Sequence, residues 1–125
     1  MRRFVTAAGL AATVFGVFAC GSSYGSSSPS APSSPAAPPP GAVVINVVAI
    51  NGAQSFSPNP ATVPAGQMVV WHNVDTVTHR VVLNDGQLDS GNIAPGASSP
   101  AMNLSAPGPY HCSIHPPMVG TIVRQ

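Results

Sequence analysis

The sequence predicts an all-β domain, a Greek-key β-sandwich, in residues 42–125. After Gly41 no segment keeps a helical period, and the apolar, β-branched runs are short. Proline and glycine interrupt these runs at close intervals. Short strands separated by turns at this spacing are typical of antiparallel sandwiches with Greek-key connections.

The first 19 residues have the pattern of a signal peptide. Arg2 and Arg3 precede an apolar run over residues 4–19. This run is shorter than the roughly 20 residues that a membrane-spanning helix needs. A short positive segment before such a run is typical of an export signal. We therefore expect residues 1–19 to direct export.

The end of the apolar run, Val17-Phe18-Ala19-Cys20, resembles the lipobox of bacterial lipoproteins. In that motif a small residue precedes a cysteine that becomes lipidated and N-terminal. The resemblance implies that Cys20 is lipidated and anchors the chain to a membrane by lipid alone. Cleavage after Ala19 without lipidation is the alternative, because the same residues fit a soluble secretory site. An uncleaved anchor is a third interpretation.

Residues 20–41 consist almost entirely of serine, proline, alanine and glycine. Such a composition cannot bury a core, so we expect a disordered linker. At about 3.1 Å per residue, the extended chain would reach roughly 65 Å. The segment would serve as a tether between an anchor and the folded domain, and a simple spacer is equally compatible.

Three runs in the domain are expected strands: residues 43–50, 68–73 and 78–83. Asn46 is the only polar residue of the first run, which is typical of a buried strand. Alternation in the second run places Trp71 inward and His72 outward. Further turns are expected at Asn84-Asp85-Gly86, Ser90-Gly91, Pro95-Gly96 and Pro107-Gly108.

Charged residues are few. Lysine is absent, and after residue 19 only Arg80 and Arg124 stand against three aspartates. Nucleic-acid binding needs clustered lysine and arginine, so the sequence argues against it. A docking surface on this domain would be largely uncharged.

The residues that carry chemistry lie near the C-terminus. Cys112, His115 and Met118 are spaced three apart in a segment too rich in proline to be helical. A tight loop can therefore direct a thiolate, an imidazole and a thioether to one point, and His79 on an earlier strand can add a second imidazole. Two histidines and a cysteine with a weak axial methionine are the ligands of a blue copper site. Such a ligand set suits both Cu(I) and Cu(II), so little rearranges when an electron moves.

This pattern resembles the cupredoxins, of the short-loop amicyanin and plastocyanin-like type. The resemblance covers nearly all of residues 43–124. It rests on Cys-x-x-His-x-x-Met before a closing Gly-x-x-Val strand, on Trp71-His72-Asn73 followed by Thr78-His79, and on the spacing of the turns. It implies that His79, Cys112 and His115 are equatorial copper ligands and that Met118 is the axial ligand.

Two features depart from the cupredoxin pattern. Arg80 stands where relatives often have an asparagine that steadies the ligand loop, so that support must come from elsewhere. The segment before Cys112 is about two residues shorter, which preserves strand parity and leaves Cys112 facing the core.

Several other interpretations of the same residues remain. Cys112 could be an inert buried thiol, a nucleophile paired with His79 or His115, or a disulfide partner of Cys20. Zinc could occupy the site, although a thioether ligand favours copper. By strand parity His111 points away from Cys112 and is not expected to bind metal.

The function expected from this resemblance is that of a type 1 copper protein, not an enzyme, which carries single electrons in the periplasm or cell envelope. Redox partners would dock near His115, Pro116 and Pro117. Copper binding, buffering or delivery without an electron shuttle is the alternative, and a copper-free interaction module is a third. An oxidase is disfavoured because multicopper oxidases need His-x-His pairs, and the sequence contains none.

Overall fold

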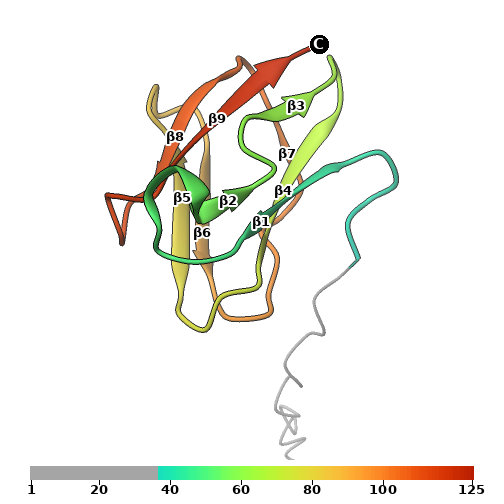
Figure 1. Ribbon diagram of the computed structural model, residues 1–125. Coiled ribbons are helices and arrows are strands. Elements are labelled where there is room, and N and C mark those ends of the chain that lie inside the picture. Colours follow the sequence, from blue (N-terminus) through green and yellow to red (C-terminus); the bar gives the residue numbers. More distant parts are fainter. Residues whose placement is uncertain (1–36) are drawn as a thin grey trace, which may run out of the picture. The chain divides into compact units, whose positions relative to one another are not determined.

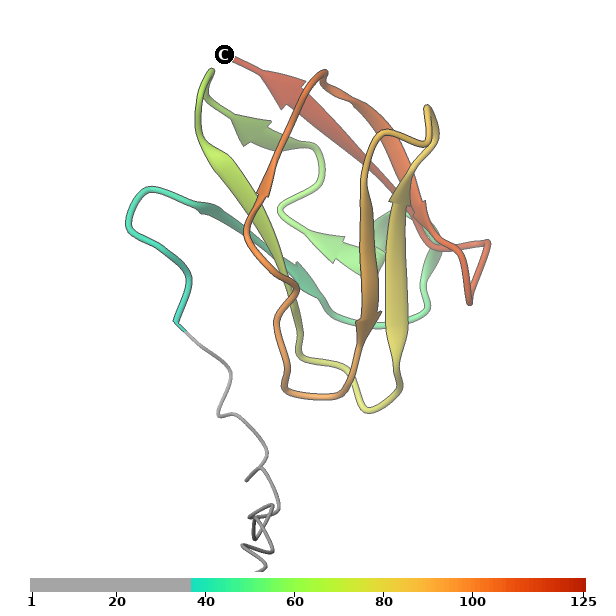
Figure 2. The same ribbon diagram turned by 180° about the vertical axis from the view of Figure 1, so that it is seen from behind.

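The computed structural model describes residues 37–125, which form nine strands and one short 3-10 helix (Figures 1 and 2). The predicted signal peptide and most of the predicted linker lie outside the described residues. The elements are β1 (Val43–Val47), η1 (Gly52–Ser55), β2 (Phe56–Ser57), β3 (Ala61–Val63), β4 (Met68–Asn73), β5 (His79–Leu83), β6 (Asp89–Ile93), β7 (Met102–Asn103), β8 (Gly108–Cys112) and β9 (Val119–Arg124). Between residues 37 and 125 no helix has the length and apolar character needed to cross a membrane.

The strands form two sheets, as the prediction of a β-sandwich requires. One sheet has the order β2-β1-β4-β7, and the other has the order β3-β9-β8-β5-β6. The chain passes from one sheet to the other five times between β2 and β8, so neighbours in sequence are often not neighbours in a sheet. The predicted fold class, an all-β sandwich with crossing connections, is confirmed.

Two strand pairs are parallel, which the expectation of an antiparallel sandwich did not include. β1 pairs with β4, and β3 pairs with β9. Parallel neighbours need a crossover connection. The first crossover, from β1 to β4, runs through η1, β2 and β3. The remaining pairs are antiparallel, including the β5–β8 and β8–β9 pairs that lie next to the candidate site.

Strand boundaries follow the sequence prediction in most places. The predicted strand at residues 68–73 coincides with β4, whereas the one at 43–50 ends at Val47, and Ile50 is 49% exposed. Ser90-Gly91 is not a turn but lies inside β6, where the pairing with β5 shifts register. Gly91 has a φ of 65°, a left-handed value that glycine adopts easily and that is common at a bulge.

The core lies between the two sheets and contains an aromatic cluster. Tyr110 of β8 makes edge contacts with Phe56 and Trp71 from the opposite sheet, at centroid distances of 4.8 and 5.6 Å. Tyr110 sits directly across from Gly120 of β9, where a side chain would meet the tyrosine ring. These contacts fix β8, and Cys112 lies two residues further along the same inward face.

Candidate metal centre

The site lies at one end of the β5–β8 pair. His79 is the first residue of β5, and Cys112 is the last residue of β8. These strands run antiparallel, with Val81 opposite Cys112, so the start of β5 and the end of β8 lie at the same edge. The loop after β8 carries His115 before the chain enters β9 at Val119. Two strands far apart in the sequence, together with the loop that follows the second of them, therefore meet at one point.

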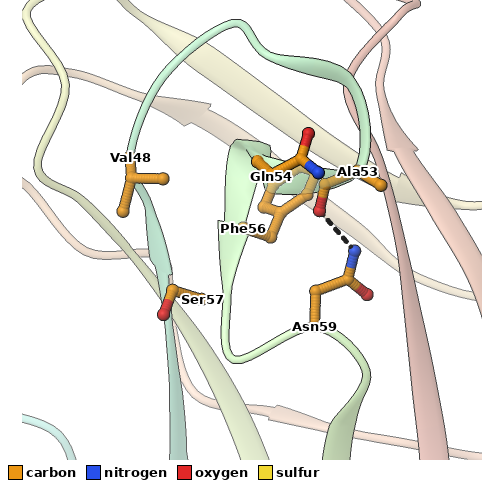
Figure 3. Close-up of a pocket in the computed structure, with 6 residues that line it drawn as sticks. All are labelled: Val48, Ala53, Gln54, Phe56, Ser57 and Asn59. Carbon is orange, nitrogen blue, oxygen red and sulfur yellow. Dashed lines mark hydrogen bonds between the residues drawn. The ribbon is translucent and has the colours of Figure 1, made fainter.

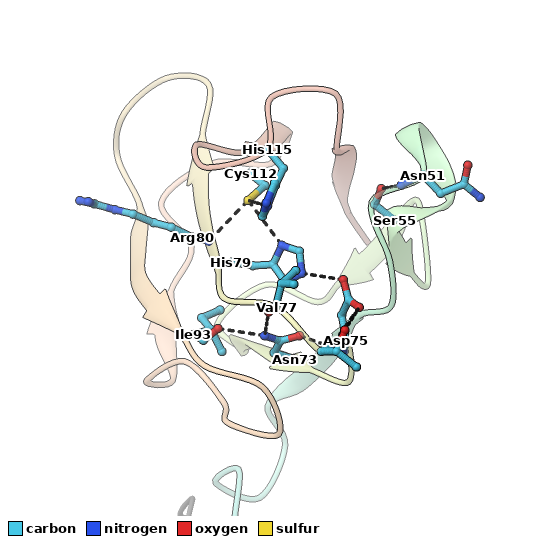
Figure 4. A network of polar contacts seen from close by, with 11 residues as sticks. Asn51, Ser55, Asn73, Asp75, Val77, His79, Arg80, Ile93, Cys112 and His115 are labelled. Atoms are coloured by element: carbon cyan, nitrogen blue, oxygen red, sulfur yellow. Dashed lines mark hydrogen bonds and ion pairs between the residues drawn. The ribbon is translucent and has the colours of Figure 1, made fainter.

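Three of the four predicted ligands converge there. Cys112 Sγ lies 3.7 Å from Nδ1 of His79 and 3.7 Å from Nδ1 of His115 (Figure 4). The three donor atoms all lie within 4.8 Å of one another. The two imidazole rings are 5.0 Å apart between centroids and inclined at 61°. The arrangement presents two ring nitrogens and one sulfur to a common position.

The donor separations fit a bound first-row metal. Bonds of about 2.0 Å to nitrogen and about 2.3 Å to thiolate, the lengths typical of zinc, would place N and S about 3.7 Å apart at a trigonal angle. The observed nitrogen–sulfur distances are both 3.7 Å. A soft thiolate with two imidazoles is the equatorial donor set of a blue copper site. The His-Cys-His cluster therefore fits a type 1 copper centre.

Burial differs among the predicted ligands. His79, Cys112 and Met118 are completely buried, whereas His115 is half-buried. Beside His115, Ile114, Pro116 and Pro117 are exposed. The site is therefore closed on the core side and reaches the surface only through the His115 edge.

Met118 is held close to the other ligands by the main chain. Its N–H donates to the carbonyl of His115 at 3.0 Å, and its carbonyl accepts from the N–H of Cys112 at 3.1 Å. The side chain belongs to the same buried cluster as Cys112. The backbone thus places Met118 beside the site, and its role as axial ligand stays a prediction.

Arg80 contacts the ligand loop through its backbone and not through its side chain. The Arg80 N–H points to Cys112 Sγ at 3.5 Å, and its carbonyl accepts from the N–H of Ser113 at 2.8 Å. The guanidinium instead extends to Asp89 of β6, with Nε 2.9 Å from one carboxylate oxygen. β5 therefore steadies the start of the ligand loop through main-chain contacts.

Sequence reasoning missed Asp75. Its Oδ2 lies 3.0 Å from His79 Nε2, the ring nitrogen opposite the one that faces Cys112 (Figure 4). Hydrogen bonds from the Thr76 N–H and from His79 lower the pKa of Asp75. An aspartate four residues before a candidate ligand was a possible signal, but only the loop conformation shows that it turns back toward the histidine.

The other two histidines of the domain stay away from the site, as predicted from strand parity. His72 Nδ1 lies 2.9 Å from Ser98 Oγ, and His111 Nδ1 lies 2.6 Å from Asn84 Oδ1. Neither residue belongs to the His-Cys-His cluster.

Two surface depressions lie beside η1 and involve none of the predicted ligands. The larger is lined by residues of η1, β2 and their flanks: Val48, Ala53, Gln54, Phe56, Ser57 and Asn59 (Figure 3). Asn59 lines both depressions and donates from Nδ2 to the carbonyl of Ala53 at 2.7 Å. Asn59 also accepts the N–H of Thr121 at 2.9 Å, which ties this region to β9.

No protein-family model matches the sequence, and no curated protein matches it. Solved structures do. A purple cupredoxin from Nitrosopumilus maritimus is 28% identical, with 66% of this chain and 98% of that chain covered and a TM-score of 0.56. Amicyanin from Paracoccus versutus is 23% identical, with 70% and 84% covered and a TM-score of 0.52.

A third similar structure is the copper-containing nitrite reductase from Thermus scotoductus. It is 26% identical over 66% of this chain with a TM-score of 0.54, but only 22% of the reductase chain is covered. The fold of this protein is that of the cupredoxins. Its His79-Cys112-His115 cluster is the part of that fold that fits a type 1 copper centre.

Proposed function

We propose that this protein is a type 1 copper protein that carries single electrons between redox partners in the periplasm or cell envelope. The observation that carries the proposal is the approach of Cys112 Sγ to within 3.7 Å of a ring nitrogen of both His79 and His115. Similar structures include a purple cupredoxin and a copper-containing nitrite reductase, which supports copper as the metal.

His79, Cys112 and His115 would hold the ion, with Met118 as a weak axial ligand. When bound, copper supplies a one-electron exchange between Cu(I) and Cu(II). The protein contributes rigidity, because His79 and Cys112 are completely buried and lie on paired strands. Ligands that cannot relax keep one geometry for both oxidation states. Their burial also excludes water from all but the His115 edge.

Redox partners would dock at the His115 edge. His115 is the only half-buried member of the cluster, and the exposed Ile114, Pro116 and Pro117 surround it with apolar surface. An uncharged patch of this kind suits brief contacts with more than one partner. The proposal includes an anchor at a membrane surface through lipidated Cys20, which the lipobox-like Val17-Phe18-Ala19-Cys20 supports, with residues 20–41 as the tether.

The test is to add Cu(II) to the purified full chain and to record its visible absorption and electron-spin spectra. An intense blue thiolate-to-copper band is expected in the wild type and in Cys20→Ser, which removes the other thiol of the chain. Cys112→Ser should lose the band. No intense band in the wild type, or an unchanged band in Cys112→Ser, would contradict the proposal.

Electrochemistry then separates an electron carrier from a protein that only buffers or delivers copper. A carrier should give a reversible one-electron wave and fast self-exchange, because its buried ligands hold one geometry. Rapid transfer of copper to a chelator, together with slow self-exchange, would favour copper delivery instead.

A further inference from the structure

The ring of His79 lies between the thiol of Cys112 and the carboxylate of Asp75. Its Nδ1 lies 3.7 Å from Cys112 Sγ, and its Nε2 lies 3.0 Å from Asp75 Oδ2 (Figure 4). The histidine is completely buried, and the aspartate side chain is 18% exposed. The carboxylate accepts a hydrogen bond only if Nε2 carries the proton. In the neutral imidazole this bond therefore leaves the Nδ1 lone pair free on the side of the thiol.

The carboxylate itself is held in place by its loop. Its other oxygen, Oδ1, accepts the N–H of Thr76 at 2.7 Å, and the Asp75 N–H donates to Asn73 Oδ1 at 3.0 Å. Asn73 is completely buried at the end of β4, and its Nδ2 donates to the carbonyls of Val77 and Ile93 at 2.7 and 2.9 Å. The loop thus fixes Asp75 from both sides, independently of any metal.

We infer that Asp75 is a positioning residue of the metal centre: it sets the tautomer of His79 and favours the divalent over the monovalent state of the bound metal. This inference rests on the proposed function. The physical reason for the second effect is charge. A carboxylate at hydrogen-bond distance makes the imidazole a stronger donor, and its negative charge stabilises the more highly charged ion. Because His79 is buried, solvent screens the interaction between the Asp75 carboxylate and the metal ion less.

The first test needs no metal. In the copper-free full chain labelled with nitrogen-15, the ring spectrum of His79 at a pH where imidazoles are neutral should show the proton on Nε2 and none on Nδ1. In Asp75→Ala the ring should become a mixture of both tautomers. A proton on Nδ1 in the wild type, or an Nε2 proton that is equally fixed in Asp75→Ala, would overturn the tautomer assignment.

The second test measures reduction potential in copper-loaded protein. Asp75→Asn removes the charge at nearly constant shape, and Asp75→Glu keeps it. Mutation of an outer hydrogen-bond partner typically lowers metal affinity by about 10-fold to 100-fold. If about tenfold of that loss falls on Cu(II) alone, the potential of Asp75→Asn rises by about 59 mV. Asp75→Glu should stay closer to the wild type.

Asp85→Asn is the matched control, because it removes the same charge at the turn beyond the far end of β5. Urea unfolding of each variant shows whether it is folded. If a variant used for the potential is unfolded, the ring spectrum of His79 is the deciding measurement. Equal potentials in the wild type, Asp75→Asn and Asp85→Asn would overturn the inference. The absence of a blue band in the wild type would instead contradict the proposed function and leave the result on the tautomer valid.

Discussion

Nδ1 of His79 and Sγ of Cys112 lie 3.7 Å apart although 33 residues separate them in the chain. Their proximity follows from the antiparallel pairing of β5 with β8, which aligns the start of one strand with the end of the other. Both side chains face the core and are completely buried. The strand pairing therefore brings two of the predicted ligands together, and the loop after β8 adds His115.

Met118→Leu tests the axial ligand. We expect the blue absorption to remain, because the three equatorial donors are intact, and leucine fills the buried space of the thioether. Loss of a sulfur donor should destabilise Cu(II) more than Cu(I) and raise the reduction potential, which voltammetry measures. Met102→Leu is the control, since Met102 lies half-buried on β7. Equal potentials in the two variants would remove Met118 from the ligand set.

Gly120→Ala should destabilise the fold. A Cβ at this position would overlap Cζ of the Tyr110 ring, which is locked in the aromatic cluster. Forced repacking of this kind costs about 1–3 kcal/mol, measurable as a lower free energy of unfolding in urea. Gly108→Ala is the matched control, because a Cβ there meets nothing within 4 Å. Equal stability of both variants would show that the tyrosine moves freely.

We expect the Arg80–Asp89 ion pair to contribute a small amount to the free energy of unfolding, and this contribution should be lost in acid. The hydrogen bond from Arg80, with a second from the Gly91 N–H, lowers the pKa of Asp89 from 3.8 to about 2. Because the folded pKa is the lower one, the stabilisation is complete above pH 3.8 and is lost as the pH falls toward 2. Both side chains are nearly half exposed, so we expect less than about 1 kcal/mol.

Urea unfolding of the wild type and Asp89→Asn at several pH values measures this contribution. The difference in the free energy of unfolding should shrink as the pH falls from 3.8 and disappear only below about pH 2. Asp85→Asn, whose carboxylate accepts only the N–H of Gln87 among the described contacts, should show a smaller difference. A difference for Asp89→Asn that persists or grows toward pH 2 would contradict the assignment.

Electron exchange should depend only weakly on salt. The exposed residues beside His115, namely Ile114, Pro116 and Pro117, carry no charge, and the domain as a whole has few charged side chains. Salt slows association mainly where complementary charges steer the encounter. Stopped-flow reduction and oxidation by reagents of opposite charge should therefore vary little with ionic strength. A steep fall in rate with added salt would contradict docking at the His115 edge.

Cys20→Ala tests the lipid anchor. If Cys20 is lipidated after export, the variant should move from the membrane fraction to the soluble fraction, detected by antibody against the domain. The control variant Ser22→Ala, two residues further on, should leave the distribution between membrane and soluble fractions unchanged. Membrane association that survives in Cys20→Ala would mean that another feature holds the protein there.

The sequence alone determined the fold class and the chemistry of the site, because both are written in local patterns. The apolar run at residues 68–73 coincides with β4, and the spacing of Cys112, His115 and Met118 indicates one tight loop regardless of what surrounds it. Strand parity also placed Cys112 inward correctly, since side-chain direction alternates along any strand.

Which groups meet in the folded chain depends on strand register and on loop conformation. The parallel β1–β4 and β3–β9 pairs, the irregular pairing at Gly91 and the hydrogen bond from His79 to Asp75 all depend on register and loop conformation. No local pattern encodes the two parallel pairs, because each joins strands whose relative position is set by packing of the whole core. Asp75 is close to His79 in the sequence, but only the loop conformation turns it back toward the ring. The same packing turned the Arg80 side chain outward and left its backbone to support the ligand loop.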